Sequence, residues 1–173
     1  MIEQERTFLA KKLPELEGCE SKEIIDLFIP KSSPHPNLRI RKNGDKLMIT
    51  RKCLPENGDK SAMIEETINL SEAEFLTLSK VDGNGFTKIR YLYPFQGRTV
   101  EIDVYQDALK GLVVVDFEFE TEEEKIAFKM PNFCLCEVTS EEFIAGGMLA
   151  GKRYEDIEEK LKEFGYEKTN HQF

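Results

Sequence analysis

The stretch Leu38 to Lys52, LRIRKNGDKLMITRK, contains two short alternating runs on either side of Asn43-Gly44-Asp45. An Asn-Gly pair between alternating runs is a strong local signal for a tight antiparallel turn, so this stretch predicts a β-hairpin. Successive side chains of a strand point to opposite faces, so Arg39 and Arg41 share one face and Ile40 lies on the other. The first strand of the hairpin is therefore expected to have one charged face and one apolar face.

The same division recurs in the other alternating segments of the chain. We expect strands at 1–10, 63–69, 87–93, 99–105 and 112–120. Their charged faces carry Glu3 and Glu5; Lys88 and Arg90; Glu101 and Asp103; and Asp116, Glu118 and Glu120, while Lys46, Thr50 and Lys52 share a face in the second strand of the hairpin. Apart from the strands at 1–10 and 63–69, the opposite faces carry mainly aliphatic and aromatic side chains. Each strand thus has a charged face of a single sign.

This pattern has two interpretations. In the first, the strands form an ordinary antiparallel sheet with one face in the core and one in water. In the second, they close into a barrel whose apolar outside is covered by helices and whose inside is a polar tunnel. Basic strands would then bind phosphate groups, and acidic strands would hold a divalent metal ion through oxygen ligands. The segregation of the two signs into different strands favours the second interpretation, because a face that is only solvated would mix them.

Local signals place short helices between and after the strands. Segment 21–29 has apolar residues at helical spacing, with Ser21 as an N-cap and Pro30 as a stop, which predicts a helix from Ser21 to Ile29. Capping boxes predict further helix starts at Ser71–Glu74, Thr121–Glu124 and Thr139–Glu142. A last helix is expected at 154–164, before Gly165. The expected fold class is α+β, in a single domain spanning residues 1–173.

Composition excludes several classes of function. The chain has 173 residues, of which 33% are charged, and a net charge of −9, as in a globular protein that does not bind nucleic acid nonspecifically. Apolar segments are too short for a transmembrane helix, and the N-terminus is charged where a signal peptide is apolar, so we expect a cytoplasmic protein without a membrane partner. His35 and His171 are the only histidines, which excludes histidine-based catalytic triads.

Several of these motifs together resemble the triphosphate tunnel metalloenzymes, or CYTH family, which includes class IV adenylyl cyclases, thiamine triphosphatases and inorganic triphosphatases. The resemblance runs from Glu3 to about Lys152. In chain order, the matching elements are Glu3-Gln4-Glu5 for an opening Glu-x-Glu motif, LRIRKNGDKLMITRK for an Arg-x-Arg strand and its Thr-x-Lys partner, KIRY at 88–91, EIDVY at 101–105, GLVVVDFEFE at 111–120, and Lys152 for a C-terminal lysine.

The resemblance implies an eight-stranded antiparallel β-barrel with flanking helices, whose tunnel binds a small-molecule triphosphate together with Mg²⁺ or Mn²⁺. The phosphate-binding residues it implies are Arg39, Arg41, Lys52, Lys88, Arg90 and Lys152. The metal ligands it implies are Glu3, Glu5, Asp103, Asp116 and Glu118. It also implies a direct part in catalysis for Glu5, Lys52 and Arg90.

Thr7 departs from the family motif, which has lysine at this position. A threonine hydroxyl is neutral, and Arg6 cannot replace the lysine because it points to the other face of the strand. The function we favour is a metal-dependent phosphohydrolase acting on inorganic triphosphate or on an organic or nucleoside triphosphate. A class IV adenylyl cyclase and, because of Thr7, a noncatalytic binder of triphosphate or polyphosphate stay as alternatives. A homodimer is also left open.

Overall fold

The computed structural model describes residues 2–56 and 62–169, and their side chains from Gln4 to Glu56 and from Met63 onward. The strands are β1 (Ile2–Ala10), β2 (Glu20–Ile29), β3 (Leu38–Asn43), β4 (Lys46–Cys53), β5 (Ala62–Asn69), β6 (Asn84–Phe95), β7 (Arg98–Tyr105), β8 (Val113–Phe119) and β9 (Cys134–Glu137). The helices are α1 (Glu72–Leu78), α2 (Glu122–Ala127), α3 (Gly146–Leu149) and α4 (Tyr154–Glu163), with short 3-10 turns η1 (Asp107–Leu109) and η2 (Glu142–Ile144).

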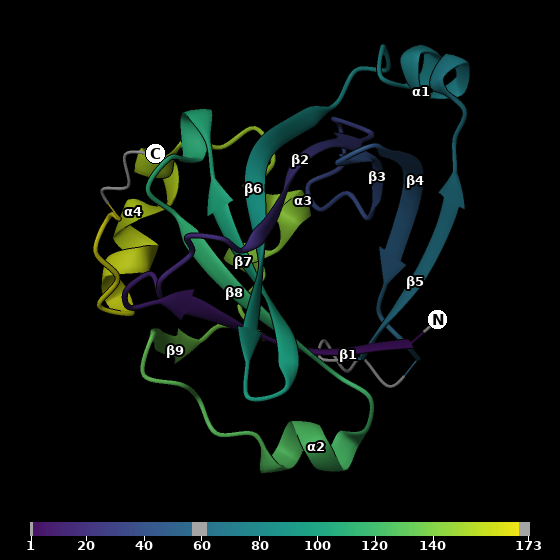
Figure 1. The fold of residues 1–173 in the computed structure, drawn as a ribbon. Helices are drawn as coiled ribbons and strands as arrows, with labels where there is room; N and C mark the ends of the chain where they lie inside the picture. The colour runs from purple at the N-terminus through teal and green to yellow at the C-terminus, as the bar shows by residue number, and fades with distance from the viewer. Residues whose placement is uncertain (1, 57–61, 170–173) are drawn as a thin grey trace.

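The strands pair antiparallel in the order β5-β4-β3-β2-β6-β7-β8-β1-β9. Strand β5 also pairs with the start of β1, where Ile2 lies opposite Ile64. Eight of the described strands therefore form a closed circuit, and β9 pairs with the last residues of β1, Phe8 to Ala10. Helices α1, α2 and α4 lie outside this ring (Figure 1). The predicted α+β class and eight-stranded antiparallel barrel are confirmed, and β9 is an addition to it.

Residues 20–29 form strand β2, so the predicted helix from Ser21 to Ile29 is wrong. Ile24, Asp26 and Phe28 are buried and alternate with more exposed neighbours, which is the period of a strand. A short apolar run does not distinguish a strand from a helix by periodicity alone. Here β3 and β6 hydrogen-bond to the two edges of the segment, and these long-range pairings decide its structure.

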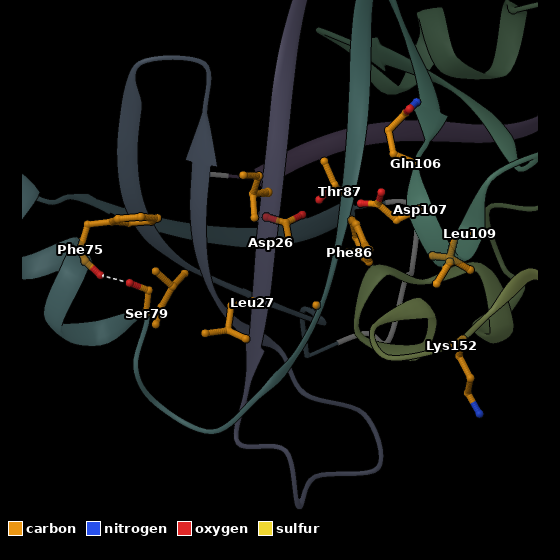
Figure 2. A pocket seen from close by; sticks show the side chains of 14 residues that line it. Asp26, Leu27, Phe75, Ser79, Phe86, Thr87, Gln106, Asp107, Leu109 and Lys152 are labelled. Carbon is orange, nitrogen blue, oxygen red and sulfur yellow. Dashed lines mark hydrogen bonds between the residues drawn. The ribbon is translucent and has the colours of Figure 1, made fainter. Parts of the chain in front are cut away.

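Helix α1 begins and ends on side-chain hydrogen bonds. Ser71 and Glu74 form the predicted capping box, and the Ser79 hydroxyl donates to the carbonyl of Phe75 at the last turn (Figure 2). The helix buries no residue, so these local hydrogen bonds, not core packing, stabilise it.

Within the described residues, no helix has the length and apolar character needed to cross a membrane.

The other two capping predictions have opposite outcomes. The Thr121 hydroxyl accepts the amide of Glu124 at the start of α2, as predicted. The predicted helix start at Thr139 is wrong, because η2 begins at Glu142 without a side-chain cap. The Thr139 hydroxyl instead accepts the backbone amide of Thr7, 3.0 Å away, and so ties the C-terminal segment to β1.

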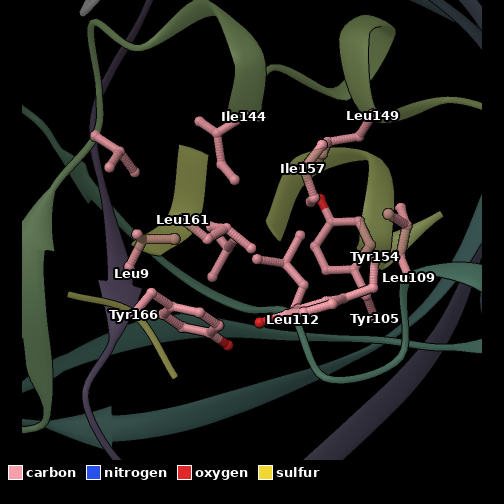
Figure 3. Packing of buried hydrophobic residues seen from close by; sticks show 12 residues of the cluster. Leu9, Tyr105, Leu109, Leu112, Ile144, Leu149, Tyr154, Ile157, Leu161 and Tyr166 are labelled. Atoms are coloured by element: carbon pink, nitrogen blue, oxygen red, sulfur yellow. The ribbon is translucent and has the colours of Figure 1, made fainter. Parts of the chain in front are cut away.

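Two apolar clusters flank the ring. One covers the outer face of β1, β7 and β8, where Phe8, Ile102 and Phe117 pack against Phe133 from the segment after α2. The other joins Leu9, Tyr105 and Val114 to the C-terminal segment, including α4 (Figure 3). The buried α4 residues of this second cluster are Tyr154, Ile157 and Leu161, and α4 confirms the predicted last helix.

Candidate functional site

A cavity of about 680 Å³ lies inside the ring, and every strand of the closed circuit contributes side chains to it. Its basic lining residues are Arg39, Arg41, Lys52, Lys88 and Arg90. Its acidic lining residues are Glu5, Asp26, Glu65, Glu101, Asp116, Glu118, Glu141 and Glu142. The interpretation of the charged strand faces as the inside of a closed barrel is confirmed, and the alternative of a sheet facing water is wrong. Lys46 shares the predicted face but is exposed and does not line the cavity.

Arg41 is held by a carboxylate that the sequence analysis missed. Its Nε and Nη2 atoms donate to the two oxygens of Asp26, each at 2.6 Å, and both side chains are buried. Burial raises the pKa of Asp26, but the hydrogen bonds and charge of Arg41 outweigh it and leave the pKa below its ordinary value. Asp26 was missed because its segment was assigned to a helix. The alternation of Ile24, Asp26 and Phe28 was the available signal.

Lys88 and Arg90 share a second buried carboxylate, Asp103. Arg90 donates to both of its oxygens at 2.7 Å, and the Lys88 ammonium donates to one of them. Arg90 also pairs with Glu101 and lies 3.9 Å from Asp116. Asp103 is 1% exposed, and it fixes two cations that line the cavity. A metal-binding role for Asp103 stays a prediction, since both of its oxygens accept hydrogen bonds from cationic side chains.

The acidic side of the cavity is formed mainly by β1 and β8. Glu5 lies opposite Glu118, and Thr7 lies opposite Asp116, so their side chains meet across adjacent strands. The Thr7 hydroxyl donates to Asp116 Oδ1 at 2.7 Å. Burial and the negative charges of Asp103 and Glu5 raise the pKa of Asp116 to about 7. Burial and the neighbouring carboxylates therefore both disfavour the charged form of Asp116.

The donor chemistry of this acidic side fits a hard divalent cation. Glu5, Asp116 and Glu118 offer carboxylate oxygens, the ligands that Mg²⁺ and Mn²⁺ prefer. In the part of the chain whose side chains are described, no three carboxylate, histidine or cysteine side chains are already placed to hold one ion. The side chain of Glu3, the remaining predicted ligand, lies outside the described residues.

Lys52 and Arg39 pair with carboxylates on other strands of the ring. The Lys52 ammonium donates to Glu5 Oε1 at 2.7 Å, and Arg39 Nη2 donates to Glu65 at 3.4 Å. The Nε atom of Arg39 is buried and has no hydrogen-bond partner among the described residues. An unpaired guanidinium donor on the cavity wall is suited to an anionic ligand.

The structure does not bring Lys152 to the other predicted phosphate-binding residues. Its side chain lines a separate groove of about 440 Å³, on the outer side of β2 between α1 and η1 (Figure 2). The C-terminal segment reaches the cavity elsewhere, through Val138, Glu141 and Ile144. No motif in the sequence indicated these contributions, because they depend on how the segment after β9 packs against the ring.

No protein-family model matches the sequence, and none of the curated proteins matches it. Solved structures do share its fold. Two crystal structures of the protein NE1496 align with this chain, and one of them describes it as an inorganic triphosphatase. The TM-scores are 0.64 and 0.63, and the sequence identities are 25% and 23%. Each alignment covers 87% of this chain, and they cover 99% and 95% of the NE1496 chains. A candidate adenylate cyclase from Bacillus halodurans aligns with a TM-score of 0.55 and 15% identity, over 99% of this chain and 94% of its own.

Proposed function

We propose that this chain, which has the fold of the triphosphate tunnel metalloenzymes, is a metal-dependent phosphohydrolase that acts on a triphosphate. The observation that carries the proposal is the division of one cavity into a basic side, from β3 and β6, and an acidic side, from β1 and β8. A triphosphate carries negative charge along its whole length, so it needs several cations placed in a row. The NE1496 triphosphatase, which has the same fold, supports this substrate class.

The arginines are suited to hold phosphate oxygens in fixed positions. A guanidinium has five N–H donors in one plane, and the carboxylates of Asp26 and Asp103 each occupy two donors of Arg41 and Arg90. The carboxylates thereby fix the planes of the two guanidiniums. The remaining donors of Arg41 are available to a ligand, whereas Arg90 Nη1 already pairs with Glu101. Fixed positive charge of this kind stabilises the charge that develops on a transferred phosphoryl group.

We propose that Glu5, Asp116 and Glu118, with Glu3, hold the Mg²⁺ or Mn²⁺ ion. When bound, the ion would supply charge neutralisation on the phosphate oxygens and activation of a water nucleophile. Thr7 places a hydroxyl beside Asp116 where the family motif has lysine, so this side of the cavity has one cation fewer than the motif provides. Cytoplasmic location and a homodimer stay predictions of the sequence.

The test is phosphate release from tripolyphosphate and, separately, from ATP, with Mg²⁺ or Mn²⁺. We expect release by the full chain and its loss in Arg41→Gln and Glu5→Gln. Matched controls are Arg51→Gln and Glu66→Gln, which remove the same charges from exposed positions on β4 and β5. Circular dichroism checks that each variant is folded.

The products distinguish the alternatives. Cyclic AMP and pyrophosphate from ATP would assign the cavity to a cyclase instead. Tight binding of tripolyphosphate without any product, together with turnover in Thr7→Lys, would assign it to a noncatalytic binder. Loss of activity in the control variants to the same extent would show that the cavity residues have no specific part.

A further inference from the structure

The ion pair between Lys52 and Glu5 differs from the buried ion pairs that Arg41, Lys88 and Arg90 form with Asp26 and Asp103. It joins β4 to β1, two strands that β5 separates in the ring, and so it connects the basic side to the acidic side. Both side chains are 22% exposed. Glu5 is also the carboxylate that the proposed function assigns to the metal ion.

Three of the other four cations are held by buried carboxylates, and the fourth, Arg39, lies 3.4 Å from the partly exposed Glu65. Arg41 binds Asp26, and Lys88 and Arg90 bind Asp103; these two carboxylates are 1% exposed. Moving such a cation would leave a buried carboxylate without a partner, which is costly. Lys52 has a single ammonium on a flexible stem and a partly exposed partner, so its ammonium can move to another anion at small cost.

We propose, on the basis of the proposed function, that Lys52 couples metal binding to triphosphate binding. In the free protein its ammonium neutralises Glu5 at the place where a divalent cation would bind. If Glu5 held a cation, the Lys52 ammonium would lose this partner and could turn into the cavity. The released charge is then available to a phosphate oxygen. Because such coupling is reciprocal, the triphosphate also raises the affinity for the metal ion.

Removing the ammonium should therefore change the two affinities in opposite directions. Lys52→Gln leaves Glu5 without its competitor, so we expect tighter binding of metal alone. The same variant lacks a cation for phosphate, so we expect weaker binding of triphosphate alone. Replacing a residue that only supports the structure would not increase the affinity for either ligand.

The experiment uses the folded full chain without substrate turnover. Electron paramagnetic resonance of free Mn²⁺ gives the dissociation constant for the metal, and calorimetry with tripolyphosphate in EDTA gives that of the anion. We expect Lys52→Gln to bind Mn²⁺ about tenfold more tightly, the scale for removing a unit charge near a divalent cation, and tripolyphosphate about threefold to tenfold more weakly. Lys52→Met repeats the test with a different neutral side chain.

Lys46→Gln is the matched control, because it removes the same charge from an exposed position at the other end of β4. We expect its two dissociation constants to stay within about twofold of the wild type. Weaker or unchanged Mn²⁺ binding in both Lys52 variants, or an equal gain in Lys46→Gln, would overturn the coupling. If the wild type binds neither Mn²⁺ nor tripolyphosphate, the proposed function itself fails.

Discussion

Asparagine in place of Asp116 is expected to change how the stability of the protein depends on pH. The pKa of Asp116 is raised to about 7 by burial and by the charges of Asp103 and Glu5. In an unfolded chain an aspartic acid titrates near pH 4. Between these values the folded protein holds a proton that the unfolded chain has released. The contribution of Asp116 to stability is therefore full below about pH 4 and is lost as the pH rises through about 7.

The size of the effect follows from the raised pKa. One pKa unit corresponds to about 1.4 kcal/mol, and the folded carboxyl group loses most of its proton between pH 6 and pH 8.5. Over this interval the wild type should lose about 1–2 kcal/mol of unfolding free energy through this group alone. In Asp116→Asn this loss is absent. Asparagine has the same shape and keeps an oxygen that accepts the Thr7 hydroxyl.

Urea unfolding followed by circular dichroism, in EDTA at pH 6 and pH 8.5, measures the effect. The difference in unfolding free energy between the two pH values should be smaller in Asp116→Asn than in the wild type by about 1–2 kcal/mol. Glu159→Gln, which removes an exposed carboxylate of α4, should retain the pH dependence of the wild type. Equal pH dependence in the wild type and Asp116→Asn would refute the reasoning, because Asp116 would then titrate alike in both states.

Three further substitutions test how much a buried ion pair, an apolar cluster and a helix cap contribute to stability, each by urea unfolding at pH 7. Asp26→Ala leaves the buried Arg41 without its carboxylate and should lower the unfolding free energy by about 3–5 kcal/mol. The control Asp82→Ala breaks the exposed pair with Lys31 and should lower it by less than about 1 kcal/mol. Similar losses in the two variants would contradict the role of burial. Leu161→Ala removes a fully buried side chain and should cost about 2–5 kcal/mol, and a smaller loss would mean that the C-terminal cluster refills the space. Ser71→Ala removes the cap of α1 and should cost about 1 kcal/mol, and an unchanged unfolding free energy would show that the cap does not stabilise the protein.

The hairpin at 38–52 and the charged strand faces were predictable because their signals are local. Alternation fixes which side chains share a face, whatever the strand later pairs with. Alternation alone therefore predicts that Arg39, Arg41, Lys88 and Arg90 line the cavity, as they do. The capping boxes of α1 and α2 are local in the same sense, since each lies within four residues.

Predictions failed where a distant partner outweighed the local signal. Segment 20–29 has an N-cap residue and a proline stop, but its backbone groups bond to β3 and β6. The Thr139 hydroxyl could cap a helix, but it accepts the amide of Thr7 from a strand more than a hundred residues earlier. The resemblance implied a phosphate-binding role for Lys152; the packing of the C-terminal segment places its side chain on an outer groove, and the role stays a prediction.

The sequence by itself determined that this chain has amphipathic strands with charges of one sign on each, and that these charges suit phosphate and a divalent cation. The order of the strands around the ring then decided which charges meet. That order places Asp26 beside Arg41, Asp103 beside Arg90, and Glu5 within reach of Lys52. Strand pairing joins residues that are far apart in the chain, so local alternation carries no information about these partners, and only the tertiary structure defines them.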